Sequence, residues 1–387
     1  MYSIGVVTTN RADYGLLKNI IDSIEHDQSL KLHLIVTGAH LSASNTESKK
    51  EITDDGIIDF AQVDMMFYGS SPEAITKTMG IGMITFSEYF RNHKLDLLVV
   101  LGDRYELISI CSAAMNFEIP IAHISGGEKT NGVLDDIVRH VITKMSSIHF
   151  PCNAAYAKRI VQLGEHPECI FNYGDVGIEN IKNMEIFSRD EVYSRLEVPP
   201  YKEFVLVTYH PTIFENCDNP IETLINVMKQ MSDVYFIVTA GNSDLGNDDN
   251  NQRLESFASL SANVSYYESL GSKLYLSSLK FASAVLGNSS SGIVEAPYLR
   301  TPTVNIGVRQ DGREFAQSIL CSGMEESEIQ KCLKTAMSGA FQKFIEDIPL
   351  YYESDDTAVR IVRKIKESLC NGKIDRYKEF YDVKFDV

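Results

Sequence analysis

Short apolar segments alternate with amphipathic segments of helical period along almost the whole chain of 387 residues. In the first half, the apolar segments that predict strands are 3–8, 31–37, 60–66, 95–101, 119–123 and 148–150. The helices predicted between and after them are 14–25, 72–92, 105–116, 134–144 and 154–163. Strands and helices that alternate in this way are typical of a parallel sheet with helices on both faces.

The same alternation starts again after a polar, proline-containing stretch at about 188–202. The strands predicted there are 204–208, 235–239, 264–267, 284–286 and 303–306. The helices predicted there are 221–231, 252–259, 273–282, 293–299 and 326–337, with two more at 357–368 and 374–381. A chain of this length usually divides into more than one core. We therefore predict an α/β protein with two doubly wound domains, at 1–185 and 186–365, followed by a C-terminal helical segment at 366–387.

The composition of the chain argues against some classes of binding partner. The formal net charge is -17, which opposes binding to nucleic acid and to anionic membranes, because both need an excess of positive charge. No apolar run approaches the roughly 20 residues that span a bilayer, and no signal peptide precedes the first strand pattern. The cysteines are scattered without a Cys-x-x-Cys pair, which argues against a disulfide scaffold or a zinc site. We expect a cytoplasmic protein without nucleic-acid or membrane partners.

The segment 285–295 combines the end of a buried strand, a tight turn and the predicted start of a helix. Ser289 and Ser290 supply hydroxyl groups there, and Gly287 allows a ligand to approach the backbone closely. Unpaired N–H groups at a helix start favour a phosphate, although an ordinary serine N-cap has the same pattern. No lysine follows the serines, so this is not the nucleotide loop of P-loop enzymes.

Charged side chains and histidines follow most of the predicted strands. They are Arg11 and Asp13 after the first strand, Asp103 and Arg104 after the fourth, Ser125 and Glu128 after the fifth, Asp135, Asp136 and Arg139 on the next helix, and His210 in the second domain. Singly, such a histidine is more often structural, and an Asp beside an Arg is often a surface ion pair. Because the carboxyl ends of parallel strands form the ligand-binding edge of a sheet, the whole set predicts an active site.

Taken together, these motifs resemble those of the UDP-N-acetylglucosamine 2-epimerases, and specifically the hydrolysing branch that serves sialic-acid and legionaminic-acid pathways. The resemblance covers nearly the whole chain. The residues that carry it are, in the family's order, Arg11-Ala12-Asp13-Tyr14, Gly102-Asp103-Arg104, Gly126-Gly127-Glu128, Asp135-Asp136, Arg139-His140, His210-Pro211, the serine loop 287–292 and Gly307-x-Arg309-Gln310. The resemblance implies a GT-B architecture, with two Rossmann-like domains, the active site in the interdomain cleft and a C-terminal helix that returns to the first domain. It further implies a UDP-sugar substrate, no metal, no nicotinamide or other cofactor, and a homodimer or homotetramer.

The reaction that the resemblance implies has two stages. The C2 proton is removed and UDP is expelled by anti elimination, which leaves a 2-acetamidoglycal. Water then adds to the double bond, and UDP-N-acetylglucosamine would give N-acetylmannosamine and UDP. The C2 proton is weakly acidic, so a carboxylate base must be held close and partly desolvated. UDP leaves as an anion, so cationic donors must meet its diphosphate.

The resemblance also implies roles for individual residues. The catalytic candidates are Asp103, Glu128, Asp135, His210 and Arg139. The residues expected to bind UDP are Arg11, Arg104, His210, Asn242, Ser289, Ser290, Glu295 and Arg309, with Glu295 on the ribose hydroxyls. His40 and Ser125 are expected near the sugar. Each carboxylate has the alternative role of an ion-pair partner for a neighbouring arginine, and this alternative applies above all to Asp136.

One position departs from the family pattern, because many members carry an acid where Ser125 stands. Either Glu128 takes over its function, or the enzyme acts on another sugar, such as the UDP-2,4-diacetamido-2,4,6-trideoxyglucose of legionaminic-acid synthesis. Three further alternatives stay open at this point: a non-hydrolysing epimerase, a glycosyltransferase of the same fold and a nucleotide-sugar binder without activity. The non-hydrolysing branch usually has a longer basic element where this chain has His210-Pro211-Thr212.

Overall fold

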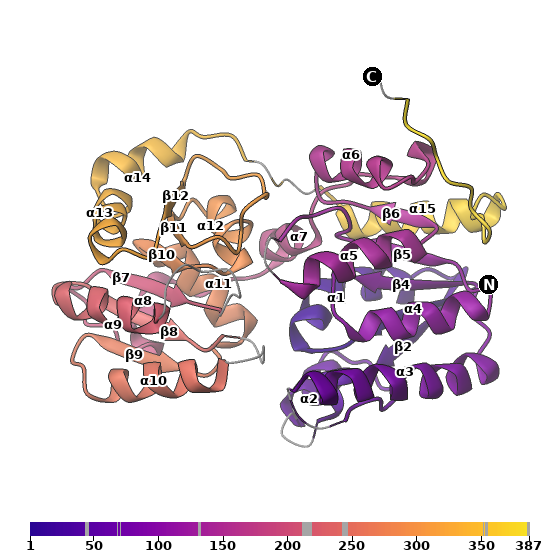
Figure 1. Cartoon of the computed structure of the whole chain (residues 1–387), viewed down its shortest axis with the longest axis horizontal. Helices are drawn as coiled ribbons and strands as arrows, with labels where there is room; N and C mark the ends of the chain where they lie inside the picture. The colour runs from indigo at the N-terminus through magenta and orange to yellow at the C-terminus, as the bar shows by residue number, and fades with distance from the viewer. Residues whose placement is uncertain are drawn as a thin grey trace. The chain divides into compact units, whose positions relative to one another are not determined.

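The computed structural model describes residues 1–42, 46–67, 69, 71–130, 133–210, 219–241, 247–350, 352 and 355–384. The chain divides into two compact units (Figure 1). Unit 1 comprises Met1–Glu128, Leu134–Asn180 and Glu353–Val387, and unit 2 comprises Lys129–Val133 and Ile181–Tyr352. The chain therefore passes into unit 2 at 180/181 rather than 185/186, and it returns to unit 1 at 353 rather than 366.

Unit 1 is built on a six-stranded parallel sheet with the order β3-β2-β1-β4-β5-β6. Its strands are β1 (Tyr2–Thr8), β2 (Leu30–Val36), β3 (Ala61–Gln62), β4 (Leu97–Leu101), β5 (Ile121–Ile124) and β6 (Ile148–Phe150). Its helices are α1 (Arg11–Glu25), η1 (Gly38–Leu41), α2 (Thr46–Asp54), α3 (Pro72–Asn92), α4 (Glu106–Asn116), α5 (Leu134–Met145), α6 (Ala154–Gln162), η2 (Pro167–Cys169), α7 (Val176–Asn183) and α15 (Thr357–Cys370). The strand order reverses at β1, so the loops after β1 and β4 meet at the point where ligands bind in such sheets.

Unit 2 repeats this architecture with the strand order β12-β11-β10-β7-β8-β9, again all parallel. Its strands are β7 (Phe204–Thr208), β8 (Tyr235–Thr239), β9 (Val264–Tyr267), β10 (Ala284–Gly287), β11 (Thr303–Ile306) and β12 (Ile319–Ser322). Its helices are α8 (Arg189–Arg195), α9 (Pro220–Gln230), α10 (Asn247–Ser259), α11 (Gly271–Phe281), η3 (Ser290–Gly292), α12 (Glu295–Tyr298), α13 (Glu326–Ala336) and α14 (Gly339–Glu346). Two such sheets are the predicted pair of doubly wound domains.

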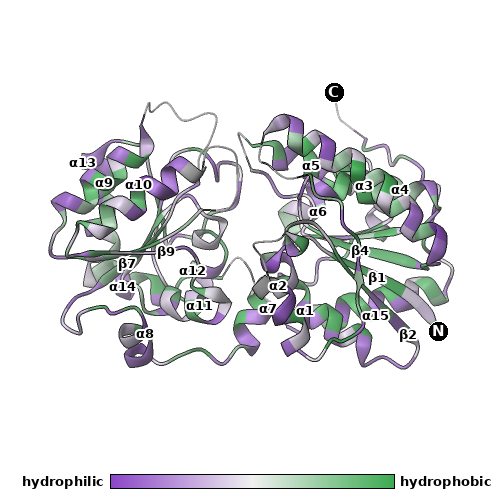
Figure 2. Ribbon diagram, turned by 90° about the horizontal axis from the view of Figure 1, so that it is seen from below, coloured by the Kyte–Doolittle hydropathy of each residue, from purple (hydrophilic) through white to green (hydrophobic). Residues whose placement is uncertain are grey.

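The central strand β4 is apolar along its whole length, as expected where helices cover both faces of the sheet. In β4 all five residues are buried. Leu97 and Val99 pack into the cluster that includes α1 and α15, and Leu98 and Val100 pack into the cluster under α3 and α4. Figure 2 shows the same arrangement, with green strands inside and purple helix faces outside. A continuous apolar strand is what a parallel sheet buried on two sides requires.

The structure corrects three predicted elements. The segment 374–381 is not helical, and the returning helix α15 packs against α1 instead. The strand predicted at 60–66 is confined to β3, and β12 was not predicted. The helix predicted at 293–299 is replaced by the turn η3 and the four-residue α12. A helix this short has little dipole, so a phosphate site at 287–292 depends on local N–H and hydroxyl groups.

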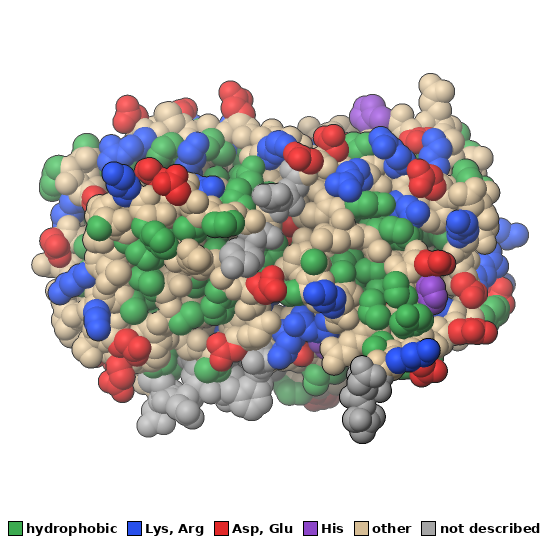
Figure 3. Space-filling model, turned by 90° about the horizontal axis from the view of Figure 1, so that it is seen from above, with side chains coloured by type: hydrophobic (Ala, Val, Ile, Leu, Met, Phe, Trp, Pro, Cys, Tyr) green, Lys and Arg blue, Asp and Glu red, His purple; other side chains and the backbone are tan. Residues whose placement is uncertain are grey.

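The described surface mixes the two signs of charge. Figure 3 shows Lys and Arg side chains interspersed with Asp and Glu over the visible face rather than gathered into one basic patch. Among the described residues, no helix is both long and apolar enough to cross a membrane.

Candidate active site

The turn after β4 is held in place by its neighbours in unit 1. Gly102 adopts a left-handed conformation with φ 74°, and its carbonyl oxygen lies 2.8 Å from Nε2 of His123 on β5. Burial lowers the pKa of His123 to about 3, so the neutral ring donates to this carbonyl and Nδ1 accepts from Thr143, 3.1 Å away. The predicted catalytic Asp103 follows this fixed turn, so its backbone position is determined by the sheet.

Asp103 is paired with Arg139, whose Nη2 donates to Oδ2 of Asp103. Arg139 lies on α5 and is 3% exposed, whereas the Asp103 side chain is 26% exposed. Asp135 lies one turn earlier on α5, on the same face as Arg139 because residues four apart are neighbours on a helix. The structure therefore brings Asp103 and Arg139 together and places Asp135 on the same helix face.

Asp136, for which an ion pair with a neighbouring arginine was the stated alternative, lies instead beside a histidine. Its Oδ2 lies 3.7 Å from Nε2 of His140, one turn later on α5. Both side chains are about a quarter exposed. Asp136 thus serves as a helix-surface partner, and it provides a control for Asp103.

A second acidic group lies beside this turn and was not assigned a role from the sequence. Asp13, near the start of α1, accepts a hydrogen bond from the Thr9 hydroxyl. Burial raises the pKa of Asp13 to about 6, against the lowering effect of the nearby Arg104 guanidinium. Nη2 of Arg104 donates to Oε1 of the fully buried Glu106, 3.0 Å away. Arg104 is therefore already neutralised by carboxylates of its own unit.

Two predicted ligand contacts of unit 1 have other partners in the structure. Nε of Arg11 lies 2.6 Å from Oε2 of Glu51 on α2, in a pair that is more than a quarter exposed. Arg11 must exchange or share this partner to bind a diphosphate. His40 is fully buried, and its Nε2 lies 2.8 Å from the Thr8 hydroxyl. Burial lowers the pKa of His40 to about 4, so we assign it a structural role and do not retain it as a sugar contact.

The turn after β5 carries Ser125 and Glu128. Ser125 has φ 61°, a left-handed conformation that costs energy for a residue with a side chain and that is common at functional sites. Glu128 is 7% exposed. The Cys152 sulfur lies 3.4 Å from the Ser125 hydroxyl and 3.5 Å from Oε1 of Glu128. No sequence motif marks Cys152, because its neighbours are ordinary loop residues.

In unit 2, one asparagine joins the ends of three strands through its side chain and its backbone carbonyl. The Asn288 side chain is fully buried, accepts from the His210 backbone N–H and donates to the His210 carbonyl, at 2.7 Å in each case. The Asn288 carbonyl accepts from Arg309, at 3.0 Å, and from Gln310, at 2.7 Å. The predicted UDP residues His210 and Arg309 are thus brought together around Asn288, which was quoted in the sequence motif but given no role.

The turn after β10 requires glycine at its first position. Gly287 has φ 143°, and a Cβ atom there would lie 1.9 Å from the Thr208 carbonyl oxygen. The next residues form η3, in which Ser290 is exposed and Ser291 is buried with its hydroxyl 2.7 Å from that of Tyr275. The loop therefore presents Ser290 to solvent at the carboxyl edge of the sheet, as the phosphate-site prediction requires.

The remaining residues predicted to bind UDP have different environments in the structure. Burial lowers the pKa of His210 to about 3, and the nearby Arg309 acts in the same direction, so the ring is neutral. Glu295 begins α12 and is partly exposed. Asn242 and Pro211 lie outside the described residues.

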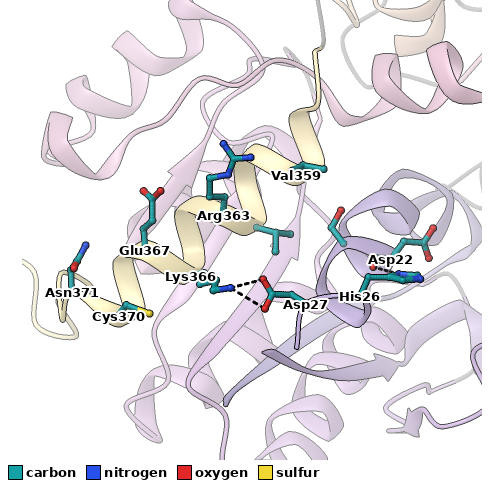
Figure 4. Close-up of a pocket in the computed structure, with 11 residues that line it drawn as sticks. Asp22, His26, Asp27, Val359, Arg363, Lys366, Glu367, Cys370 and Asn371 are labelled. Atoms are coloured by element: carbon teal, nitrogen blue, oxygen red, sulfur yellow. Dashed lines mark hydrogen bonds and ion pairs between the residues drawn. The ribbon is translucent and has the colours of Figure 1, made fainter. Parts of the chain in front are cut away.

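An open groove in unit 1 lies away from these side chains. It is formed by the end of α1 and by α15, and it is lined by Asp22, His26 and Asp27 on one side and by Arg363, Lys366 and Cys370 on the other (Figure 4). Lys366 donates to both oxygens of Asp27, at 3.0 and 2.7 Å. Because α1 begins at the carboxyl edge of the sheet and runs back, its last turn lies at the opposite edge. The strand-end residues, and not this groove, are the candidate active site. Among the described residues, no group of His, Cys, Asp and Glu is arranged to hold a metal ion.

Two doubly wound, Rossmann-like units with polar residues at the strand ends define an α/β protein with a GT-B-like fold. The chain belongs to the UDP-N-acetylglucosamine 2-epimerase family, whose model matches residues 22–366. This confirms the resemblance predicted from the motifs, and with it an enzyme of the UDP-sugar 2-epimerase class.

Individual relatives match over most of their length. The chain is 36% identical over 326 residues to a GDP/UDP-N,N'-diacetylbacillosamine 2-epimerase (hydrolyzing) of Campylobacter jejuni, covering 84% of this chain and 85% of the relative. It is 31% identical to the polysialic acid biosynthesis protein P7 of Escherichia coli, covering 99% and 98%. The solved structure of Staphylococcus aureus MnaA with UDP has a TM-score of 0.80 at 15% identity and covers 99% of this chain and 100% of that one. The UDP-GlcNAc 2-epimerase of Neisseria meningitidis bound to UDP-GlcNAc has a TM-score of 0.79 at 14% identity and covers 95% and 100%. These two structures bear out the predicted fold.

Proposed function

We propose that this enzyme hydrolyses a UDP-2-acetamido sugar with inversion at C2, releasing UDP and the free 2-epimeric sugar. The reaction is anti elimination of UDP followed by addition of water to the 2-acetamidoglycal. It belongs to the synthesis of nonulosonic, sialic-type acids. Family membership supports the reaction class, and the names of the C. jejuni and E. coli relatives support the hydrolysing branch and the pathway.

The observation that carries the proposal is the group of acidic residues at the carboxyl edge of the sheet in unit 1. Asp103 sits on a turn fixed by His123 and is paired with the buried Arg139, and Glu128 follows the adjacent strand. A carboxylate that is partly withdrawn from water and fixed in orientation suits removal of a weakly acidic C2 proton. We assign Asp103, Glu128 and Asp135 as the acid–base groups and Arg139 as the residue that orients Asp103.

In unit 2 we assign the diphosphate to the serine loop and to the Asn288 network. Ser289 and Ser290 supply hydroxyl and N–H donors, Arg309 supplies positive charge, and Glu295 receives the ribose hydroxyls. His210 is neutral and can donate one hydrogen bond to a diphosphate oxygen. A phosphate would also favour the charged form of this ring, so binding draws a proton toward His210.

For the sugar we propose a UDP-2,4-diacetamido-2,4,6-trideoxy sugar, because relatives at 36% and 29% identity are named for N,N'-diacetylbacillosamine. UDP-N-acetylglucosamine, which would yield N-acetylmannosamine, is the second candidate. It is favoured by the match to the polysialic acid protein over 99% of this chain.

The test is to incubate the enzyme with each UDP-sugar in deuterated water and to follow the products by NMR. We expect free 2-epimeric sugar with deuterium at C2, together with UDP. Deuterated UDP-sugar as the main product would instead assign the non-hydrolysing branch. Consumption of the UDP-sugar only after an acceptor is added would assign a glycosyltransferase and overturn the proposal.

We further propose that the enzyme works in the cytoplasm as a homodimer or homotetramer, as the family resemblance implies. The six cysteines among the described residues are all free thiols, which suits a reducing compartment. Light scattering after gel filtration measures the assembly, and a monomer at micromolar concentration would contradict it.

A further inference from the structure

The C-terminal segment 374–381 supplies one of the partners of a buried carboxylate in unit 1. The side chain of Glu165 is 2% exposed and lies just beyond the end of α6. Lys144 of α5 donates to Oε1 of Glu165, at 2.6 Å. Lys378 of the C-terminal segment and His149 of β6 donate to Oε2, at 2.5 and 3.1 Å. The carboxylate therefore joins two helices, one strand and the C-terminal segment.

Lys378 helps to keep this carboxylate charged in a buried place. Burial by itself would raise the pKa of Glu165, but the hydrogen bonds from its three partners outweigh burial and lower the pKa to about 2. Burial lowers the pKa of His149, although Glu165 opposes this, so the neutral ring contributes a hydrogen bond and no charge. Positive charge comes from Lys144, which is 42% exposed, and from Lys378, which is 25% exposed. A buried carboxylate that loses such a partner is strongly destabilised.

Further contacts dock the segment along the amino edge of the sheet, where the helices end and the next strands begin. The Tyr377 hydroxyl donates to Oε1 of Glu118 after α4, at 2.7 Å. The Tyr381 N–H donates to the carbonyl of Gly164 after α6, at 2.9 Å. Phe380 packs so closely on Gly164 that a Cβ atom there would lie 2.2 Å from the ring. The segment is thus held at both of its ends, at the edge opposite the strand-end acids.

One of the helices held by this cluster is α5, which carries Asp135 and Arg139. Lys144 lies in its last turn. Lys378 donates to the carbonyl of Ser146, directly after the helix, at 2.5 Å. A positive charge at this position also suits the dipole of α5. A shift of this end of α5 would move the two residues at its other end.

The other helix, α6, holds the turn that precedes Glu128. Arg159 of α6 donates to the carbonyl of Gly127. A Cβ atom at Gly127 would lie 2.5 Å from the backbone carbonyl oxygen of Tyr156, so the backbone of the helix lies directly against this turn. Since Glu165 follows α6, the position of the cluster determines the position of the helix and of the turn.

We propose that Lys378 and Glu165 are positioning residues, which fix the C-terminal ends of α5 and α6 and thereby hold the acid–base groups in place at the opposite edge of the sheet. The inference rests on the proposed function for the identity of those groups. Both residues lie at the amino edge, so they act through the helices and do not touch the substrate. A displacement of about 1 Å that starts far from the chemistry can lower a rate by about a hundredfold.

The experiment compares Lys378→Met with Lys378→Arg, which keeps the positive charge. We expect Lys378→Met to lower kcat about tenfold and to change the affinity for UDP by less than about twofold, because the diphosphate is assigned to unit 2. Lys378→Arg should restore most of kcat. The matched control is Lys366→Met, which removes the ion pair between α15 and Asp27 in the same unit without touching α5 or α6, and which should leave kcat unchanged.

Phe380→Ala provides a second variant, in case Lys378→Met does not fold. It loosens the segment on Gly164 but leaves all three partners of Glu165 in the chain. We expect the same pattern on a smaller scale, with kcat reduced about threefold and UDP affinity unchanged. If the segment only stabilised unit 1, both variants would lower the unfolding temperature and keep the wild-type kcat, which would overturn the inference.

Hydrogen exchange of the full-length proteins without substrate separates this inference from the proposed reaction. We expect the amides in the last turns of α5 and α6 to exchange at least about tenfold faster in Lys378→Met than in the wild type, and at the wild-type rate in Lys366→Met. Faster exchange in both helices supports the positioning role even if the wild type turns over neither UDP-sugar, in which case the proposed function alone fails. Unchanged exchange in Lys378→Met and Phe380→Ala, or equal losses of kcat and of UDP affinity, would overturn the inference.

Discussion

The side-chain amide of Asn288 exchanges two hydrogen bonds with the backbone of His210, 78 residues earlier in the chain. These two hydrogen bonds connect the ends of β7 and β10 in the way that backbone hydrogen bonds connect neighbouring strands. The backbone carbonyl of Asn288 accepts from the side chains of Arg309 and Gln310 after β11. One buried residue thus sets the positions of two groups that we assign to the diphosphate.

Replacement of Asn288 by alanine should therefore damage stability and UDP binding together. The His210 N–H and carbonyl would lose their Asn288 partners in a buried place, at a cost of about 3 kcal/mol. We expect the affinity for UDP, measured by titration calorimetry, to fall by about tenfold or more, because His210 loses the side-chain support that holds it beside Arg309, whose own bond to the residue 288 backbone carbonyl remains. Asn288→Asp keeps the acceptor but not the donor, and it should fall between alanine and wild type.

Asn263→Ala provides the matched control in unit 2. Asn263 donates to backbone carbonyls before β8, among them that of Val234 at 3.0 Å, and it has no contact with the strand ends. Its loss should lower the unfolding temperature and leave UDP affinity unchanged. Equal losses of UDP affinity in Asn263→Ala and Asn288→Ala would show that the effect is one of general stability.

Asp103→Asn tests the acid–base assignment in unit 1. The variant keeps the shape of the side chain but removes the charge that faces Arg139. We expect turnover to fall by at least about a hundredfold, since a positioned acid–base group contributes that much. UDP affinity should change by less than about threefold, because we place the diphosphate on unit 2. The measurements are UDP release in a coupled assay and calorimetry with UDP.

Asp136→Asn is the control for this variant, because Asp136 pairs with His140 on the same helix as Arg139, and both of these side chains are partly exposed. Exposed pairs of this kind contribute less than about 1 kcal/mol. We expect near wild-type turnover. If Asp136→Asn were as inactive as Asp103→Asn, the roles of the two acids would have to be exchanged.

The sequence was enough to predict a strand or helix wherever the local residue pattern alone determines that element. The continuous apolar run of β4 and the N-capped α3, from Pro72 to Asn92, were predicted at or near their observed bounds. The failures lie where tertiary contacts override local pattern. The segment 374–381 has helical composition, yet Lys378 binds Glu165 and the Tyr381 N–H binds the Gly164 carbonyl, which holds it extended.

The candidate site was predictable where residues sit directly after strands, as Asp103, Glu128 and His210 do. Arg139 was among the predicted residues, but Asn288 and Cys152 had no predicted role, because they reach their partners through the fold and not through spacing. His40 shows the limit of this reasoning. It follows a strand as a ligand-binding residue would, yet the structure buries it against Thr8. Position after a strand brings a residue to the edge of the sheet, but side-chain direction decides whether it faces a ligand.

Gly287→Ala should be strongly destabilising, by about 3 kcal/mol or more. The added Cβ would lie 1.9 Å from the Thr208 carbonyl oxygen, and alanine also disfavours φ 143°. The control is Gly80→Ala in the middle of α3, where a Cβ meets nothing within 4 Å. That substitution should stabilise the helix by about 0.5–1 kcal/mol. Urea unfolding measures both changes, and a Gly287→Ala protein as stable as wild type would refute the described turn.

Three of the four buried histidines among the described residues should make the protein sensitive to mild acid. Burial lowers the pKa of His40 to about 4, that of His123 to about 3 and that of His210 to about 3. In the unfolded chain these rings take up protons below about pH 6.5, and the folded protein does not until about pH 3–4. Stability therefore falls as the pH drops from about 6.5, by about 1.4 kcal/mol per pH unit for each ring. Between about pH 4 and 6, Asp13 offsets the loss of stability caused by one histidine ring. Its raised pKa lets the folded state hold a proton that the unfolded carboxylate releases.

His123→Gln isolates one of these contributions. Glutamine can still donate to the Gly102 carbonyl, but it cannot titrate, so the unfolded chain takes up one proton fewer. We expect the dependence of the unfolding free energy on pH, measured in urea between pH 6 and 4.5, to flatten by about 1.4 kcal/mol per pH unit. His26→Gln replaces an exposed ring at the end of α1 and should leave the slope unchanged. If His123→Gln and His26→Gln shared the wild-type slope, His123 would be charged in the folded protein, and its ring could not accept the hydrogen bond from Thr143 that fixes the catalytic turn.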